Sequence, residues 1–572
     1  MENIDIARIF SEVADLLEIQ GANVFRVRAY RNAARTVETL GTPIESMVSS
    51  GGNLEELPGV GKDLAGKIRE IVETGELGML RELAKELPEG LVLMMRIPGV
   101  GPKRAKQVYD SLGIATLDDL EAAARAGKLR ELRGLGPTIE AKILQGITEQ
   151  RAHAGRHPLA EAEAYVKPLF EHLRRVPGLT QIEVAGSFRR RRETVGDVDV
   201  LVAAEKPEEV TQSFVTYSQV KEVTARGDTR SAVVLRSGLQ VDLRVVPERS
   251  FGAALHYFTG SKPHNIAIRT LGVKRKLKIN EYGVFRGAKS IGGRTEEEVF
   301  KAVGLPWIPP ELREDRGEID AARENRLPKL VSPDEIRGDL QMHTTYTDGQ
   351  ASVTAMAEAC RALGYQYIAI TDHTKALRVA GGLDRTGFRK QFREIDRVQK
   401  GLSKLTILKS AEVDILDDGT LDLDEETLAA LEVVVVAVHS RFNMSRDEMT
   451  RRVVRALQHP RVHILAHPTG RLIGRREPYA IDMEQVIKAA ADHGVMVEVN
   501  AQPDRLDLSD VHVQMARAAH VTVVISTDAH RPEELRHMRY GVDQARRGWC
   551  EARDVANTYP LREFRALLRK GK

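Results

Sequence analysis

Cysteine and long apolar runs are scarce in this chain of 572 residues. Its two cysteines, Cys360 and Cys550, are too few for a disulfide framework or for a zinc site built from several thiolates. No run of about 18 apolar residues occurs that could span a membrane, and the charged N-terminus lacks the apolar segment of a secretory signal. We therefore expect a cytoplasmic protein without a membrane partner.

Charge of one sign is also nearly lacking, because the formal net charge is only +3. Such a balance does not by itself indicate a nucleic-acid partner. The basic residues do cluster, at Arg189–Arg192 and Lys274–Lys278. A basic run is usually a solvated face, so these clusters become informative only if they flank a site that handles phosphate.

What the chain does have is a series of apolar β-type runs that end in polar residues. Between Gly338 and His530 there are seven such runs. They end at His343, Asp372–His373, Glu412, His439, His467, Asn500 and Asp528–His530. In a barrel of parallel strands the carboxyl ends open on one face, so these side chains would converge. A His and carboxylate cluster suits two or three divalent cations and hydrolytic chemistry.

This pattern resembles the PHP (polymerase and histidinol phosphatase) family, whose fold is a distorted seven-stranded barrel that binds up to three metals. The resemblance implies Mn²⁺ or Zn²⁺ in two or three sites. It implies ligands at Gln341, His343, Asp348, His373, Glu412, His439, His467, Asp528 and His530. Gln341 departs from the family, which usually has His there, and an amide oxygen is a weaker ligand than imidazole. We therefore expect one metal to be held loosely.

A glycine-containing repeat lies in the N-terminal part, where apolar residues recur at helical spacing. Glu56–Ile68 and Arg96–Val108 share the core Pro-Gly-Val-Gly, and Leu132–Ile143 is a weaker copy. A Gly-x-Gly turn before a helix exposes backbone N–H groups, which grip a phosphate without reading sequence. The repeat resembles the helix–hairpin–helix motif, which implies DNA backbone binding, with a possible Na⁺ or K⁺. The hairpin positions are Gly59, Val60, Gly61, Gly99, Val100 and Gly101.

Three aspartates form a second candidate cation site. Asp197 and Asp199 stand two apart in a predicted strand and so share one face, and Asp242 in Leu239–Val246 supplies a third carboxylate. Carboxylates that hold two Mg²⁺ beside substrate phosphates are typical of nucleotidyl transfer. The preceding Gly186–Ser187 turn offers N–H groups and a hydroxyl to phosphates. This combination marks the nucleotidyltransferase superfamily.

His256–Arg269 (HYFTGSKPHNIAIR) and Ile279–Phe285 (INEYGVF) narrow the class further. With GSFRR and GDVDV they resemble family X DNA polymerases over about the first 315 residues. The resemblance implies that Asp197, Asp199 and Asp242 are catalytic and bind two Mg²⁺ or Mn²⁺. It implies a nucleotide-binding set of Gly186, Ser187, Arg190, Gly196, Arg244, Tyr257, Phe258, Gly260, Asn265, Arg269 and Tyr282.

The N-terminal residues resemble the small lyase domain of the same family, in which a lysine forms a Schiff base. The matching residue is Lys67. Asp63 stands where a supporting lysine usually lies, and an acidic neighbour keeps an ammonium protonated. We therefore favour DNA 5′-phosphate binding by Tyr30 and Lys67 over lyase chemistry.

Taken together, the chain is identified as a multidomain α/β protein. The resemblances place a helical DNA-binding domain at residues 1–85, a helix–hairpin–helix subdomain at 86–152, an α+β nucleotidyltransferase palm at 153–255 and a thumb at 256–315. A proline- and charge-rich linker at 316–334 precedes the distorted (β/α) PHP barrel of seven strands at 335–572.

The resemblances imply a monomeric bacterial enzyme of the nucleoid that fills short gaps during DNA repair. It would bind gapped or primed double-stranded DNA and dNTPs, while its barrel acts as a 3′–5′ exonuclease, abasic-site endonuclease or 3′-phosphatase. Three alternatives stay open: a barrel that is only a scaffold, a nuclease or phosphatase whose first half merely binds DNA, and a template-free or small-molecule nucleotidyltransferase. Gln341 supports the first, the aspartate trio argues against the second, and the glycine hairpins and Asn265 argue against the third.

Overall fold

The structure, a computed structural model, describes residues 3–568 except 40–43, 50, 87–89, 96, 98–99 and 154. It consists of two compact units, residues 1–154 with 472–477, and residues 155–471 with 478–572. Gly99, one of the predicted hairpin positions, lies outside the described residues. Within the described part, every helix is too short or too polar to cross a bilayer.

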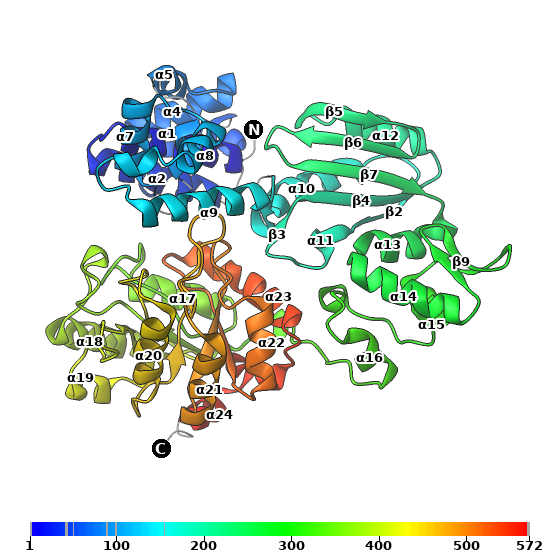
Figure 1. The fold of residues 1–572 in the computed structure, drawn as a ribbon. Coiled ribbons are helices and arrows are strands. Elements are labelled where there is room, and N and C mark those ends of the chain that lie inside the picture. Colours follow the sequence, from blue (N-terminus) through cyan, green and yellow to red (C-terminus); the bar gives the residue numbers. More distant parts are fainter. Residues whose placement is uncertain are drawn as a thin grey trace. The chain divides into compact units, whose positions relative to one another are not determined.

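The first unit is helical, as its apolar spacing predicts (Figure 1). Its helices are α1 (Asn3–Ile19), α2 (Val24–Thr39), α3 (Ile44–Ser49), α4 (Lys62–Thr74), α5 (Gly78–Glu86), α6 (Gly90–Met95), α7 (Pro102–Leu112), α8 (Leu117–Arg125) and α9 (Pro137–His153). The repeat appears as identical turns: Gly61 before α4 and Gly101 before α7 both have φ −82°, with ψ 176° and 175°. Val60 and Val100 are buried, so each turn is anchored by its valine while its backbone faces outward.

The second unit begins with a five-stranded sheet in the order β2-β4-β7-β6-β5. Its strands are β2 (Leu179–Val184), β4 (Asp197–Ala204), β5 (Val220–Arg226), β6 (Arg230–Leu235) and β7 (Gln240–Val246); β1 (His157–Pro158) and β3 (Thr194–Val195) pair separately. Helices α10 (Leu159–Leu173), α11 (Gly186–Arg189) and α12 (Pro207–Val215) accompany it. Strands β4 and β7 are parallel, which brings the carboxylates of the sheet to one end.

A small helical and β region follows the sheet. It contains α13 (Phe251–Thr259), α14 (Lys262–Lys274), β8 (Lys278–Asn280), β9 (Gly283–Arg286), β10 (Lys289–Gly292) and α15 (Glu296–Ala302). The stretch expected to be a linker contains helix α16 (Glu318–Arg323). Ala321 and Ala322 of this helix are buried in one apolar cluster with Trp549. The segment is therefore packed along its apolar side rather than exposed on all sides.

Residues from Gly338 onward form a sheet of seven strands in sequential order, each paired parallel to the next. The strands are β11 (Gly338–Asp339), β12 (Tyr367–Ile370), β13 (Thr406–Asp414), β14 (Val433–Ala437), β15 (Ile464–Leu465), β16 (Met496–Asn500) and β17 (Val523–Ser526). A parallel bridge between Met342 and Ala529 links the two ends of the sheet, so the predicted distorted barrel is confirmed.

Helices surround this barrel, which explains the unbroken apolar runs of its strands. They are α17 (Val353–Ala362), α18 (Arg385–Gly401), α19 (Glu425–Ala430), α20 (Arg446–Leu457), α21 (Met483–His493), α22 (Asp510–Ala518), α23 (Met538–Arg547) and α24 (Leu561–Leu567). In β14 all five residues are buried, because one face meets the barrel interior and the other meets helices. Such strands leave polar chemistry only at their ends.

Candidate active sites

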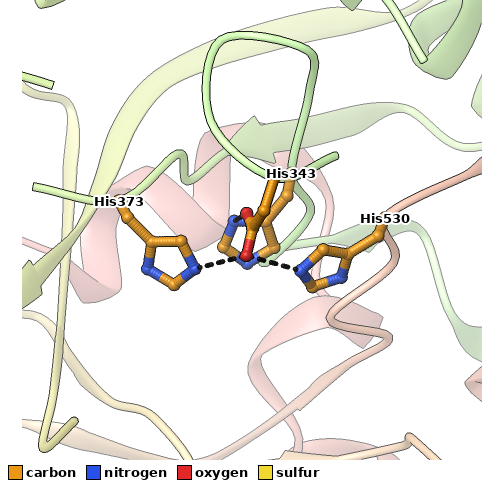
Figure 2. A group of neighbouring side chains, drawn as sticks. His343, His373 and His530 are labelled. Carbon is orange, nitrogen blue, oxygen red and sulfur yellow. Dashed lines mark ion pairs between the residues drawn. The ribbon is translucent and has the colours of Figure 1, made fainter. Parts of the chain in front are cut away.

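The barrel collects the polar strand-end residues into one cluster. Three overlapping groups have ligand atoms within 4.8 Å of one another. They are His343, Asp348, His373 and His530; His373, Glu412 and His439; and His343, Glu412 and Asp528. Figure 2 shows His343 between His373 and His530, and its ring stacks on each with centroids 4.4 Å apart. The convergence expected from the sequence is therefore present.

The carboxylate of Glu412 lies at the centre of the cluster. Oε2 of Glu412 lies 3.4 Å from His343 Nε2 and 3.3 Å from His373 Nδ1. Its other oxygen, Oε1, lies 3.2 Å from His439 Nε2 and 2.8 Å from His467 Nε2. One buried carboxylate thus meets four imidazoles, which is the geometry of a ligand shared between two cations.

Asp348 occupies the outer side of the same cluster and is the most exposed of its ligands. Its Oδ2 lies 3.5 Å from Nε2 of both His373 and His530. Asp528, which follows β17, lies 3.0 Å from His343 Nε2 and closes the set on the inner side. His467 and Asp528 both have positive φ, 27° and 51°, a conformation that is uncommon for residues other than glycine.

Charge is internally balanced in this cluster. Burial would lower the pKa of His439, but Glu412 and Asp414 raise it to about 10. Burial would likewise lower the pKa of His530, but Asp348 and Asp528 raise it to about 9. Conversely, burial opposes ionisation of Glu412, yet the imidazoles around it hold its pKa well below the usual range. The raised pKa values of His439 and His530 favour their imidazolium forms beside ionised carboxylates.

The donor set fits divalent cations for a further reason. Gln341 is 1% exposed, and both its Oε1 and Nε2 lack a hydrogen-bond partner among the described residues. In the same part of the chain Nδ1 of His343 and of His373 is also buried without a hydrogen bond. Unsatisfied buried polar atoms cost about 1–3 kcal/mol each, so their clustering beside ionised carboxylates fits residues that would hold a divalent cation.

Several residues around the cluster were not predicted as site residues. Asp414 accepts from His439 Nδ1 at 3.0 Å and fixes the imidazole so that Nε2 faces Glu412. Asn500 donates to Asp528 Oδ2 at 3.0 Å, and Nε of the partly buried Arg505 lies 3.6 Å from the same oxygen. Asp414 follows Glu412 by two residues on one strand, a spacing that could have identified it. Arg505 lies on a loop and has no such signal.

The five-stranded sheet holds the second site. In the parallel register of β4 and β7, Asp199 lies opposite Asp242, and Asp197 shares its face two residues earlier. Burial, and then the charges of Asp197 and Asp242, raise the pKa of Asp199 to about 7. Burial and the charge of Asp242 also raise the pKa of Asp197. The three predicted carboxylates are therefore close enough to repel one another.

Glycine at position 186 is required by this arrangement. Its φ of +64° is unfavourable for other residues, and a Cβ there would lie 2.7 Å from Asp199 Oδ2. Ala185 N donates to Asp199 O at 2.8 Å, which joins the turn to the strand that carries the aspartates. The Gly186–Ser187 turn thus lies directly against the carboxylates.

The run of arginines after this turn is not a solvated face. Arg189 makes two bonds of 2.8 Å to Glu296, and Arg191 bonds Asp543 at 2.5 Å and Glu163 at 2.6 Å. Arg190, a predicted phosphate ligand, bonds Glu314 through Nε at 3.1 Å. It also bonds Thr259 O through Nη1 at 2.5 Å. Ion pairs with distant carboxylates therefore hold each of these three side chains.

The remaining predicted nucleotide-binding residues lie on α13, α14 and the neighbouring strands. The guanidinium of Arg244 lies 4.3 Å from the ring centroid of Phe258, a cation–π contact that orients both. Asn265 donates to Tyr257 O at 2.7 Å, which holds its side chain against the end of α13. Gly260 has φ +66° and joins α13 to α14. Arg269 and Tyr282 are exposed, and Gly196 directly precedes β4.

In the first unit, Lys67 is held by an acid rather than activated. Its Nζ lies 2.5 Å from Asp63 Oδ1 and 5.9 Å from the Tyr30 ring centroid. Burial would lower the pKa of Lys67, but Asp63 and Tyr30 raise it above its usual value. A protonated ammonium is suited to a phosphate and unsuited to Schiff-base formation.

Comparison with known families covers most of the chain. Residues 1–77 match a helix-hairpin-helix domain and residues 91–149 a SAM-like helix-hairpin-helix tandem. Residues 156–248 match the DNA polymerase beta palm, 254–314 the DNA polymerase beta thumb, and 339–502 the PHP domain. Asp528 and His530 lie beyond the last match, so the geometry alone assigns them to the cluster.

The chain is also similar to curated proteins. It is 39% identical over 574 residues to "DNA polymerase/3'-5' exonuclease PolX" of Bacillus subtilis, covering 100% of both chains. It is 26% identical to DNA polymerase lambda of Arabidopsis thaliana, over 54% of this chain and 62% of that protein. With DNA polymerase lambda of Rattus norvegicus the identity is 27%, over 54% and 56%.

Fold and sites therefore define a protein in which a polymerase-beta-type palm and thumb precede a PHP barrel. The chain belongs to the family X DNA polymerases that carry a C-terminal PHP domain.

Proposed function

We propose that this protein is a template-directed DNA polymerase that fills short gaps during DNA repair, and that its barrel removes nucleotides from 3′ ends. The observation that carries the proposal is the pairing of Asp199 with Asp242 beside the Gly186–Ser187 turn. The substrates are gapped or primed duplex DNA and dNTPs, and the enzyme acts as a monomer. Endonuclease action at abasic sites and 3′-phosphate removal belong to the same barrel chemistry.

In the palm, Asp197, Asp199 and Asp242 would hold two Mg²⁺ or Mn²⁺ ions. Such ions supply a lowered pKa for the primer hydroxyl and neutralise the triphosphate. The chain's own groups orient the nucleotide. The Gly186–Ser187 turn offers N–H groups and a hydroxyl to the β and γ phosphates, with Arg190 and Gly196 beside it.

The residues at the end of α13 select the sugar and base. Tyr257, Phe258 and Gly260 form a wall against a 2′-hydroxyl, since a packed aromatic pair leaves no room for it. Asn265, held by the carbonyl of Tyr257, reaches the minor-groove edge of the incoming base. Arg269 and Tyr282 are exposed where a template strand can contact them, and Arg244 balances the carboxylates from beside Phe258.

In the barrel, a phosphodiester would be hydrolysed with Mn²⁺ or Zn²⁺ held by the nine predicted ligands from Gln341 to His530. Such ions supply Lewis acidity and an activated water. The chain's own contribution is orientation: Asp414 fixes the His439 ring, while Asn500 and Arg505 fix Asp528. The positive charge of the partly buried Arg505 favours an anionic substrate at the cluster.

The first unit grips DNA without reading its sequence. Backbone N–H groups of the Gly59–Gly61 and Gly99–Gly101 turns meet phosphates, with Na⁺ or K⁺ on the hairpin carbonyls. Tyr30 and the protonated Lys67 bind the 5′-phosphate of a gap. The functional parts follow the boundaries 1–85, 86–152, 153–255, 256–315, 316–334 and 335–572.

Two substitutions test the proposal on a gapped duplex with dNTPs and either Mg²⁺ or Mn²⁺. Asp199→Ala should abolish dNTP addition and leave 3′-end trimming intact, whereas His439→Ala should do the reverse. Because each variant is the control for the other, misfolding would be seen as loss of both activities. Addition by Asp199→Ala at the wild-type rate would overturn the polymerase assignment.

A second candidate function concerns only the barrel, which would serve as a metal-stabilised scaffold. Gln341 favours this alternative, because an amide binds a divalent cation more weakly than the imidazole that the family usually has. Unchanged trimming by His439→Ala, together with a lowered melting temperature, would support the scaffold.

A further inference from the structure

A cluster of charged residues joins the barrel to Arg190 within the second unit. Its centre is Arg547, the last residue of α23, whose side chain is 2% exposed. Nη1 of Arg547 donates to the backbone oxygen of Arg190 at 2.6 Å. Nη2 donates to Glu314 Oε1 at 3.1 Å and to Asp510 Oδ2 at 2.5 Å. One guanidinium of the barrel therefore contacts both the palm and the last residues of the thumb.

Glu314 carries this connection to the side chain of Arg190. The same Oε1 that accepts from Arg547 also accepts from Arg190 Nε at 3.1 Å. Arg547 thus holds the main chain of Arg190 directly and its guanidinium through one shared carboxylate. Nη1 of Arg190 is engaged with Thr259 O, so Nη2, which neither bond uses, is the nitrogen left to meet a phosphate.

The arrangement has a cost that a simple surface ion pair would not have. The side chains of Arg190, Glu314 and Asp510 are only 13%, 10% and 14% exposed, and burying charges is unfavourable unless their bonds are well directed. The planar fork of an arginine makes several directed bonds at once, which a lysine cannot. Such rigidity is useful where a cationic group must stand ready for a phosphate before it arrives.

We propose that Arg547 is a positioning residue for the nucleotide site, so that the barrel helps to build the triphosphate pocket of the polymerase. The inference rests on the proposed function, in which Arg190 meets the triphosphate. Glu314 transmits the constraint, and Asp510, which also bonds Arg316 at 3.0 Å, keeps Arg547 in place.

A neighbouring ion pair offers a matched control. Arg191 bonds Asp543 of the same helix at 2.5 and 2.8 Å, so this pair also joins the palm to the barrel. Neither Asp543 nor its bonds contact Arg190. If the arginine cluster merely fastened the two domains, breaking either pair would have the same consequence.

The experiment compares Arg547→Gln with Asp543→Asn in single-nucleotide gap filling. We expect Arg547→Gln to raise KM for the dNTP roughly tenfold with kcat changed less than about twofold, since a ground-state contact to the triphosphate is lost. Inhibition by inorganic pyrophosphate should weaken by the same factor. Asp543→Asn should leave both constants at their wild-type values.

A second variant guards against a folding defect. Glu314→Gln removes the shared carboxylate while Arg547 keeps Asp510, and it should raise KM in the same way. Melting temperature and 3′-end trimming report whether each variant is folded. A wild-type KM in both Arg547→Gln and Glu314→Gln would overturn the inference, as would an equal rise in Asp543→Asn.

The polymerase assignment is judged separately. If Asp199→Ala still adds dNTPs, the proposed function fails, whatever Arg547 does. If Asp199→Ala is inactive while Arg547→Gln and Glu314→Gln behave like the wild type, only the positioning role fails.

Discussion

The two candidate cation sites of this chain differ in the charges of their side chains. The palm site brings carboxylates together, whereas the barrel site pairs carboxylates with imidazoles. In the palm, three carboxylates share a strand end, and burial together with the charges of Asp197 and Asp242 raises the pKa of Asp199 to about 7. In the barrel, each carboxylate is surrounded by imidazoles, and the pKa of Glu412 is held well below its usual range. Arg244 and Arg190 compensate this repulsion only in part, while the barrel balances its charges internally.

The difference teaches what each site needs from its cations. A site of like charges gains the most when divalent ions arrive, since they remove a repulsion that the fold has kept. A site of paired charges must exchange protons for metal, because imidazolium cannot be a ligand. Cation binding should therefore release protons from both sites, but from carboxylates in the palm and from imidazoles in the barrel.

The largest expected effect comes from the carboxylate that meets four imidazoles. Glu412→Gln should reduce 3′-end trimming by at least about a thousandfold. The substitution removes the negative charge of a carboxylate that belongs to two of the three groups of candidate ligands. DNA synthesis on a gapped template should stay within about twofold of wild type. Rates of both reactions on the same preparation check this, and a parallel loss of synthesis would show that the sites are not independent.

In the metal-free protein, neutralising a carboxylate should raise the free energy of unfolding for the palm site and lower it for the barrel site. The folded pKa of Asp199 is raised from 3.8 to about 7, so its ionisation destabilises the fold increasingly as pH rises between these values. Asp199→Asn should therefore raise the free energy of unfolding by about 2 kcal/mol at pH 8 and by little at pH 4. Glu412 has a lowered pKa, so its charge stabilises above pH 4.5, and Glu412→Gln should lower stability at pH 8.

Urea unfolding in the presence of a chelator measures both effects. The two tryptophans, Trp307 and Trp549, belong to the second unit, so their fluorescence follows the part that contains both sites. Asp242→Asn is a matched control for the palm, because it removes one of the charges that act on Asp199. Stability changes of equal sign in Asp199→Asn and Glu412→Gln would contradict the contrast between the sites.

A smaller effect is expected from restoring an imidazole in the barrel. Gln341→His should tighten Mn²⁺ binding about tenfold, since imidazole is the better ligand and the amide of Gln341 has no competing hydrogen bond in the described part. Calorimetric titration gives affinity and stoichiometry. Gln391→His, at a buried glutamine that bonds Asp372, serves as the control and should leave the affinity unchanged. Equal affinities in Gln341→His and wild type would show that position 341 is not a ligand.

The smallest expected effect on stability concerns His264, a histidine outside both sites. His264 is buried with Nδ1 2.7 Å from Glu318 Oε1, and burial lowers its pKa despite this partner. Its neutral form is favoured in the fold, so its contribution to stability is present above pH 6.5 and is lost as pH falls below it. Between pH 7 and 5.5 the free energy of unfolding should decrease by about 1 kcal/mol.

His264→Gln should flatten that decrease in the same urea experiment. Glu318 does not confuse the test, because its pKa is lowered from 4.5 and its own contribution is lost only at lower pH. His439 provides the opposite case in the metal-free barrel: its pKa is raised to about 10, so its contribution is lost as pH rises toward that value. An unchanged pH dependence in His264→Gln would contradict the assignment.

Local patterns were enough to predict much of this protein. Alternation on strands predicted that Asp197 and Asp199 share one face, and apolar runs with polar ends predicted the convergence of His343, His373, Glu412, His439, Asp528 and His530. Both follow from backbone geometry, because side-chain direction repeats every two residues and parallel strands end together. The glycine turns before α4 and α7 were predictable for a similar reason, since a repeated backbone conformation needs repeated glycines.

The tertiary structure alone decided which charges meet across the chain. The arginines at 189–191 look like a solvated run, yet their partners lie 28 to 352 residues away. Likewise, Arg505 joins Asp528 from a loop, and the segment expected to be a linker is packed through α16. Ion pairs and packing between distant segments depend on how the chain folds in three dimensions. A pattern along the sequence does not show which distant segments come into contact.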